Sequence, residues 1–241
     1  MNTLLLRLAG PMQSWGTQSR FTIRDTGYEP SKSGVIGLLC AALGKPRDES
    51  HLDNQGKPTL LTLAALRMGV RVDREGVLQK DYHTAGGSRH DDYGVVKASG
   101  AKGDTVVSHR YYLADADFLV GLESGSEELL RQLDTALANP HWQLFLGRKS
   151  FVPSLPVRVP SGLLCNMSLE AALQKDWPKD LRGKSPARLR CVVEPSGPAS
   201  SATEVRHDVP LCFATRQFTI RYVKTDWMTC PEGASDDNRG T

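Results

Sequence analysis

Hydrophobic and polar positions first form a clear pattern at residues 3–8, TLLLRL. Leu4, Leu6 and Leu8 share one face of an extended chain, because successive side chains of a strand point to opposite sides. We therefore predict a strand here, and we expect it to end at the Ala-Gly-Pro sequence that follows.

Helical spacing comes next, in PSKSGVIGLLCAALGKP. Apolar residues recur three and four positions apart from Val35 to Leu43, as on the buried face of a helix. Ser31 or Ser33 is the expected N-cap, and Gly44 is expected just past the C-terminus. This segment is the best-defined helix in the sequence.

The remaining pattern predicts two further strands, a second helix and a fourth strand. The helix is expected to open at Ser124, with Glu127 completing a capping box, and to end at Asn139-Pro140. The three strands are predicted at residues 60–72, 118–122 and 142–146.

This order of elements is the βαββαβ pattern of an α+β, ferredoxin-like (RRM-like) fold. The long insert at about residues 73–115 is predicted as an extended β-hairpin, with arms at 82–84 and 106–108. We expect a domain over residues 1–150, a smaller β-rich C-terminal lobe over 151–230 and a disordered tail over 231–241. RNA-recognition domains share this topology, but a fold alone does not assign a function.

Composition excludes several classes of protein. The 241 residues are 39% hydrophobic and 24% charged, so a folded core is expected. No segment approaches the roughly 20 apolar residues of a membrane span, and the N-terminus lacks a signal-peptide pattern. Five cysteines without a C-x-x-C pair and six histidines without a metal-binding pattern predict neither zinc nor disulfides. We expect a cytoplasmic protein without a metal or other cofactor.

The net charge of +3 is unevenly distributed. Residues 140–190 hold nine Lys and Arg against three Asp and Glu, whereas the insert is nearly neutral. A local basic stretch is typical of a polyanion-binding surface, since each neutralised phosphate releases counterions. A solvated face is the other interpretation.

Four segments could bind a nucleic acid. The loop after the first strand carries Gln13, Ser14 and Trp15, and is either a turn anchored by one ring or a surface that binds something flat. Lys32 lies at the start of the predicted helix, where free backbone amides favour an anion. In LFLGRKS, a glycine that allows close backbone approach precedes Arg148 and Lys149.

The insert is the fourth candidate, because it mixes basic and aromatic side chains. Such a hairpin could wedge between the bases of a single strand or contact a protein neighbour. Its basic residues and histidines are His83, Arg89, His90, Lys97, His109 and Arg110.

Catalysis is a further alternative. Metal-independent RNA cleavage needs a base, an acid and a cation near the reacting phosphate. Tyr28, His83, Lys97 and His109 are of the right types, although structural roles are equally open to them. Paired carboxylates for two-metal chemistry are not expected, because Asp91-Asp92 lie at the predicted hairpin tip.

Several of these segments together resemble a known family. The motifs are LLLRLAGPMQSWG, PSKSGVIGLLCAALG with KPRD after it, DYHT, HRYYL and LFLGRKS, and they run through most of residues 3–150. They resemble the CasD family, the fifth Cas protein family (RAMP superfamily) as it occurs in the type I-E CRISPR surveillance complex, Cascade. The C-terminal part matches this pattern only loosely.

The resemblance implies a ferredoxin-like core with a β-hairpin thumb that caps the repeat-derived 5′ handle of CRISPR RNA. It also implies partners: the Cascade backbone subunits, the large PAM-reading subunit and, through the complex, target DNA. In the type I-E branch a separate subunit cuts the precursor RNA, so the family member is non-catalytic. In the type I-C branch the counterpart is the processing endoribonuclease and uses Tyr, Lys and His.

The resemblance also gives expected roles to single residues. Gln13 and Ser14 would reach bases or sugars, and Trp15 would stack a base or anchor the loop. The thumb would press on the junction between handle and spacer. The full set of expected RNA-binding residues is Gln13, Ser14, Trp15, Arg24, Lys32, Ser33, His83, Lys97, His109, Arg110, Gly147, Arg148, Lys149 and Arg216.

Three functions therefore stay open at this point. The first is a non-catalytic subunit that binds the RNA handle and supports RNA-guided recognition of foreign DNA. The second is a metal-independent endoribonuclease that processes precursor CRISPR RNA. The third is a protein-assembly module with little RNA affinity of its own.

Overall fold

The structure is a computed structural model of the whole chain. It describes all residues except 20–21, 50–55, 87–95, 97–99, 101–104, 176, 179–180, 182–185, 198–203 and 232–241. The expectations for Arg89, His90, Lys97, the Asp91-Asp92 pair and nearly all of the C-terminal tail lie outside the described residues.

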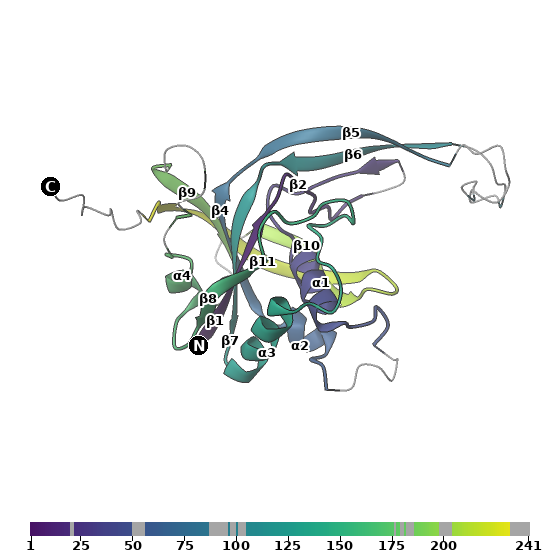
Figure 1. Cartoon of the computed structure of the whole chain (residues 1–241). Helices are drawn as coiled ribbons and strands as arrows, with labels where there is room; N and C mark the ends of the chain where they lie inside the picture. The colour runs from purple at the N-terminus through teal and green to yellow at the C-terminus, as the bar shows by residue number, and fades with distance from the viewer. Residues whose placement is uncertain are drawn as a thin grey trace.

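A seven-stranded sheet forms the body of the molecule (Figure 1). Its strand order is β10-β11-β9-β4-β7-β1-β8. The predicted strands at residues 3–8 and 118–122 are confirmed as the neighbouring strands β1 and β7. The strands are β1 (Asn2–Ala9), β4 (Arg67–Arg74), β7 (Asp117–Ser124), β8 (Arg158–Leu164), β9 (Arg188–Val193), β10 (Glu204–Cys212) and β11 (Gln217–Thr229).

A second sheet is built on the predicted hairpin, which extends away from the body (Figure 1). Its arms β5 (Val77–Ala85) and β6 (Val106–Ala114) pair antiparallel along their whole length. The short strand β2 (Met12–Gln13) pairs with β6 at its base, and β3 (Ile23–Arg24) pairs with the middle of β6. The first loop of the chain is therefore joined to the hairpin by backbone hydrogen bonds.

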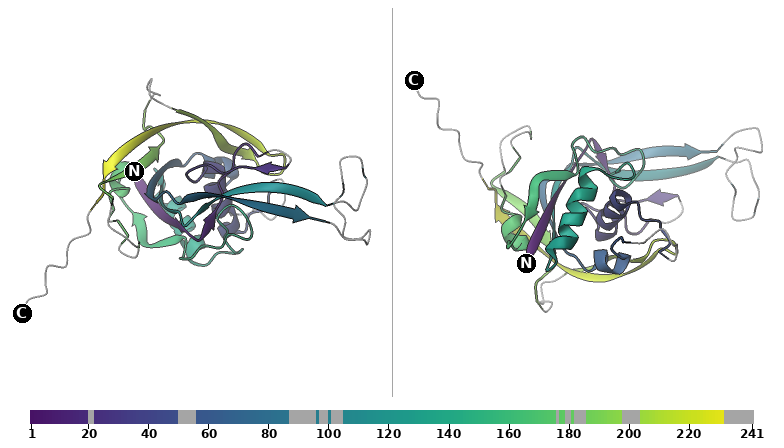
Figure 2. Two further views of the ribbon diagram at one scale, coloured as in Figure 1. Left: turned by 90° about the horizontal axis from the view of Figure 1, so that it is seen from above. Right: turned by 60° about the horizontal axis from the view of Figure 1, so that its bottom comes forward.

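Helices cover both faces of the large sheet. The helices α1 (Lys32–Leu43), α2 (Leu60–Ala64) and α3 (Glu127–Ala138) pack on one face, where α1 and α3 lie side by side (Figure 2). The short α4 (Leu169–Ala172) covers part of the other face. The fold is thus mixed α+β, mostly strands with few helices. Within the described residues, every helix is too short or too polar to span a bilayer.

The predicted ends of α1 are confirmed. The hydroxyl of Ser31 accepts a hydrogen bond from the backbone N–H of Gly34, so it is the N-cap. Gly44 follows the helix at φ +65°, a left-handed conformation that glycine adopts without strain.

Two predicted elements differ in their boundaries. Residues 60–72 are not one strand, because the side chain of Thr59 caps the short helix α2 before β4 begins. Helix α3 is capped by Ser126, whose hydroxyl accepts from the Leu129 N–H, whereas Ser124 ends strand β7.

The predicted strand at residues 142–146 is also wrong. Leu144 and Leu146 are buried, but they belong to an irregular loop that packs into the core. The strand that pairs with β1 at this side of the sheet is β8. On the other side, β9 pairs with β4, so the large sheet runs across the expected domain boundary at residue 150.

Candidate nucleic-acid interface

A groove of about 1020 Å³ follows one face of α1. Three segments form its walls: α1 itself, the loop after α3, and the turn between β10 and β11. It brings together four residues expected from the sequence to bind RNA, namely Ser33, Gly147, Lys149 and Arg216.

The charge of the groove is positive. Lys149 and Arg216 are exposed, and Arg47 adds a third exposed cation. Lys45 also lines the groove, but its ammonium group forms an ion pair with Glu49 at 2.8 Å. None of the described residues that line the groove is acidic. The lining of the groove therefore presents three exposed positive charges to an anionic ligand.

Aromatic side chains line the same groove, and the sequence analysis missed them as ligand-binding residues. They are Trp142, Phe145, Phe213 and Phe218. The indole of Trp142 is 47% exposed, which is unusual for so large an apolar group. Its position just before the basic motif LFLGRKS was the signal that could have identified it.

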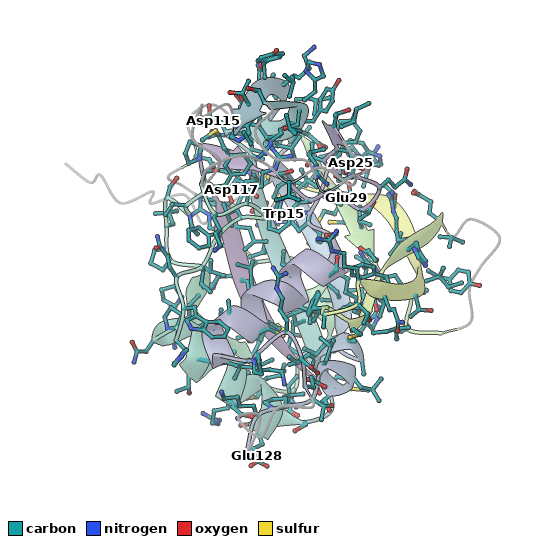
Figure 3. The ribbon with its side chains drawn as sticks, turned by 90° about the vertical axis from the view of Figure 1, so that its right-hand side faces the viewer. Trp15, Asp25, Glu29, Asp115, Asp117 and Glu128 are labelled. Carbon is teal, nitrogen blue, oxygen red and sulfur yellow. The ribbon has the colours of Figure 1, made fainter. Side chains whose placement is uncertain are left out.

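Gln13 and Trp15 do not reach this surface. Gln13 is fully buried, and its amide donates to the carbonyls of Leu8 at 2.9 Å and Ala116 at 2.8 Å. Its carbonyl accepts from the Trp15 indole N–H at 3.2 Å. The buried ring of Trp15 lies above α1 (Figure 3), within 2.8 Å of where a Cβ on Gly34 would stand. Trp15 therefore anchors the loop, and the expectation that Gln13 reads a base is wrong, because its polar atoms are used inside the protein.

Ser14 and Gly147 hold two loops together. The backbone N–H of Ser14 donates to the Leu146 carbonyl at 3.1 Å, and the Ser14 hydroxyl donates to the Tyr111 carbonyl at 3.2 Å. A Cβ on Gly147 would lie 1.8 Å from the Ser14 carbonyl oxygen. With its φ of +95°, Gly147 is required by this backbone contact, whatever ligand it faces. Ser14 is buried, so its expected contact with a base or sugar is not available here.

The structure corrects the prediction that Lys32 binds a phosphate. Its side chain is buried, and its ammonium group pairs with Glu194 at 2.9 Å. Its backbone N–H donates to the Asp208 carboxylate at 2.7 Å. Burial lowers the pKa of Lys32 from its ordinary value, and the nearby Glu194 opposes this shift. The lysine expected to hold a phosphate is thus part of an internal ion-pair network.

Arg221 completes that network. Its guanidinium forms two hydrogen bonds with Asp208, at 2.7 and 2.9 Å, and one with Glu194 at 3.0 Å. The network joins the start of α1 to β10 and β11, the strands whose connecting turn forms one wall of the groove. It therefore fixes the position of that wall.

Arg24, Arg110 and Arg148 form a second basic cluster beside the groove. Arg24 and Arg110 are register partners in β3 and β6. The Arg148 guanidinium donates to the carbonyl of Tyr111 at 2.9 Å and to that of Arg24 at 3.4 Å. Burial, and then repulsion from Arg110, lower the pKa of Arg148 from its ordinary value. The cluster lies beside the middle of β6, and Arg148 precedes Lys149 of the groove in the chain.

The histidines on the hairpin arms are not joined to Tyr28. His83 lies 3.7 Å from the Asp81 carboxylate, and the ring of His109 packs edge-on against Tyr82 at 5.7 Å. The carbonyl of Tyr28 accepts from Arg190 on β9. Among the described residues, no hydrogen bond or ring contact assembles these candidate catalytic groups, and no three His, Cys, Asp or Glu residues gather as metal ligands.

Comparison with known proteins agrees with these features. The profile of the family described as CRISPR-associated protein (Cas5) matches residues 3–224. A relative, the CRISPR system Cascade subunit CasD of Escherichia coli (strain K12), is 36% identical over 159 residues, which are 61% of this chain and 65% of that protein. The match thus spans slightly less than two thirds of the relative's length.

Two solved structures are also similar. The crystal structure of a Cas protein superposes with a TM-score of 0.70 at 42% identity, covering 96% of this chain and 98% of that one. A chain of a CRISPR RNA-guided surveillance complex gives a TM-score of 0.71 at 35% identity, with 95% and 91% covered. The chain therefore belongs to the CRISPR-associated Cas5 family, as a protein of the CasD type.

Proposed function

We propose that this chain is a non-catalytic Cascade subunit that binds the 5′ handle of CRISPR RNA in the groove along α1. The observation that carries the proposal is the composition of the groove: exposed Lys149, Arg216 and Arg47, four aromatic side chains and no acidic residue among its described lining. Cations neutralise phosphates, and aromatic rings stack unpaired bases. The names of the E. coli relative and of the surveillance complex support the assignment to Cascade.

The order of the strands supports a ferredoxin-like core. Strands β4, β7, β1 and β8 are neighbours in the sheet, with α1 between β1 and β4 and α3 between β7 and β8. That is the βαββαβ connection. In this proposal the β5–β6 hairpin is the thumb, and its strongly exposed strand β5 contacts the RNA or a neighbouring subunit.

The second basic cluster extends the proposed path of the RNA. Arg24, Arg110 and Arg148 would contact the backbone between the groove and the hairpin, where His83 and His109 lie on the arms. The proposed partners are the Cascade backbone subunits, the large PAM-reading subunit and, through them, target DNA. The proposed location is the cytoplasm.

One experiment separates this function from its two alternatives. The purified chain is incubated with its own repeat RNA in EDTA, and RNA binding, the products on a denaturing gel and, in parallel, co-purification with the other Cascade subunits are recorded. Bound but intact RNA is expected. A discrete cut at the 5′ end of the handle would instead assign the processing nuclease, with Tyr28, His83, Lys97 and His109 as candidate catalysts. Absence of binding, with assembly into the complex retained, would assign the assembly module.

A further inference from the structure

The outer edge of strand β5 is open to pairing. Its inner edge is bound to β6 over nine consecutive register pairs, from Val77 to Ala85, without a bulge. Among the described strands β5 has no other partner, and seven of its nine residues are exposed. The hairpin extends away from the body, so the body leaves this edge uncovered (Figure 1). An open edge presents a row of unpaired backbone N–H and C=O groups, on which another strand can form.

The two edges of the large sheet differ from β5, because both are protected. Strand β10 contains Pro210, and its pairing with β11 has two register shifts. Strand β8 contains Pro160, and its pairing with β1 is also irregular. Proline lacks a backbone N–H and bulges twist an edge away from a partner, so neither strand readily accepts another. The β5 edge has neither form of protection, which indicates that another strand covers it.

The sequence of β5, VLQKDYHTA, is compatible with pairing to a second copy of itself. In a two-fold symmetric antiparallel pair, opposite residues lie on the same face of the sheet, so the residue at the centre lies opposite itself. Centring the pair on Lys80 or on Asp81 would place like charges opposite each other, which is unfavourable. Centring it on Tyr82 places Asp81 opposite His83 of the second copy, twice, and the two tyrosines opposite each other.

The side chains that meet in this register are accessible and complementary. Asp81 and His83 have side chains that are 50% and 42% exposed, and their closest charged atoms within one chain are 3.7 Å apart, too far for a hydrogen bond. An imidazole N–H of the second copy can therefore donate to the Asp81 carboxylate. Tyr82 is 64% exposed, and its ring is positioned by an edge-on contact with His109 of β6. Aromatic pairs and opposite-charge pairs between antiparallel strands stabilise a sheet.

We propose that the chain on its own forms a two-fold symmetric dimer, in which β5 pairs antiparallel with β5 of a second copy, centred on Tyr82. The pairing joins the two hairpins into one sheet of order β6-β5-β5-β6, with residues 79–85 of each copy opposite one another. Because the strands are antiparallel, the two bodies lie at opposite ends of this sheet. Each copy occupies the open edge of the other, so the pairing stops at the dimer. The inference goes beyond the proposed function, because the dimer requires no RNA.

Sedimentation of the purified chain without RNA tests the dimer. Wild type is expected to change from monomer to dimer as its concentration rises. Tyr82→Asp removes the aromatic pair and places two carboxylates opposite each other, so the dissociation constant of the dimer should rise at least about tenfold. Tyr222→Asp, at an exposed tyrosine of β11, is the matched control and should keep the wild-type dimer. Both positions are exposed, so both variants are expected to fold.

A covalent trap tests the register. Because residue 82 lies opposite itself, Tyr82→Cys should form a disulfide between the two copies under mild oxidation. Lys80→Cys, which lies opposite Thr84, is the control for position, and wild type is the control for the native cysteines. Both should give far less cross-linked dimer.

Three results would overturn the dimer as proposed. They are a wild type that stays monomeric at every concentration, a dimer that Tyr82→Asp does not weaken, and equal cross-linking of the Tyr82→Cys and Lys80→Cys variants. Each would leave the proposed function intact, because RNA binding is measured in a separate experiment. Absence of RNA binding would likewise leave the dimer intact.

Discussion

The Asp208 carboxylate accepts a hydrogen bond from the backbone N–H of Lys32 at 2.7 Å, across 176 positions of the chain. The N-terminus of a helix attracts anions, because its first N–H groups lack partners within the helix. Here the protein supplies that anion itself. The start of α1 is therefore held inside the protein, while the exposed cations and aromatic side chains of the groove lie farther along the helix.

Removing the Asp208 carboxylate should destabilise the fold. In Asp208→Ala the buried Arg221 loses its bidentate partner, and the Lys32 N–H loses its acceptor. Breaking a buried ion pair from one side typically costs about 3–5 kcal/mol. Urea denaturation should show a loss of this size in the free energy of unfolding. Asp226→Ala, at an exposed ion pair, is the control and should leave the midpoint nearly unchanged. A midpoint for Asp208→Ala equal to that of the control would contradict the network.

Gln13→Ala should lower stability without lowering RNA affinity. The change leaves the carbonyls of Leu8 and Ala116 and the Trp15 indole N–H without their partner. Unsatisfied buried groups cost about 1–3 kcal/mol each, so a loss of about 3 kcal/mol is expected. Thermal unfolding and RNA titration of the folded variant measure the two effects, with the exposed Gln174→Ala as control. An intact melting temperature together with weaker RNA binding would restore the base-reading role.

The rate of alkylation should be lower for the buried cysteines than for the exposed ones. Burial raises the pKa of Cys40 and of Cys191 to about 11 each, whereas hydrogen bonding with Thr215 lowers the pKa of Cys212. The thiolate is the reactive form. At pH 8 most Cys40 and Cys191 groups are therefore protonated as well as buried. Iodoacetamide followed by mass spectrometry should show Cys212 and the exposed Cys165 modified first. Modification of Cys40 at the rate of Cys165 would disagree with the packing around α1.

Local chemistry explains which elements could be predicted from the sequence. The ends of α1 depend on the Ser31 cap and on Gly44, both within the segment itself. Residues 60–72 form a nearly continuous apolar run, in which a buried helix and a buried strand have the same pattern. The hydroxyl of Thr59 caps a helix at the beginning of this run, so the first residues are helical. Leu144 and Leu146 alternate like strand residues, but their loop packs into the core without a partner strand.

Residues of the groove could be named from the sequence only where their side chains or backbone are exposed. Gly147 and Lys149, two of the residues expected to bind RNA, line the groove, and Arg216 lines it from a distant turn. Lys32 was misassigned because its partner Glu194 lies 162 positions away. A lysine at the start of a helix is typical of an anion site, and only the tertiary structure shows that it is buried and paired.

We propose that the groove along α1 binds RNA through its cations. The most direct measurement is the affinity for single-stranded repeat RNA as a function of salt, for wild type and for a Lys149→Ala/Arg216→Ala double variant. A matched control removes two exposed cations outside the groove, in Arg131→Ala/Lys224→Ala.

Each lost phosphate contact should reduce the slope of log affinity against log salt by about 0.7 for a single strand. The groove variant should therefore bind at least about tenfold more weakly at low salt, with a slope smaller by about 1.4, while the control keeps the wild-type slope. Equal affinity and equal slope for wild type and the groove variant would contradict the account.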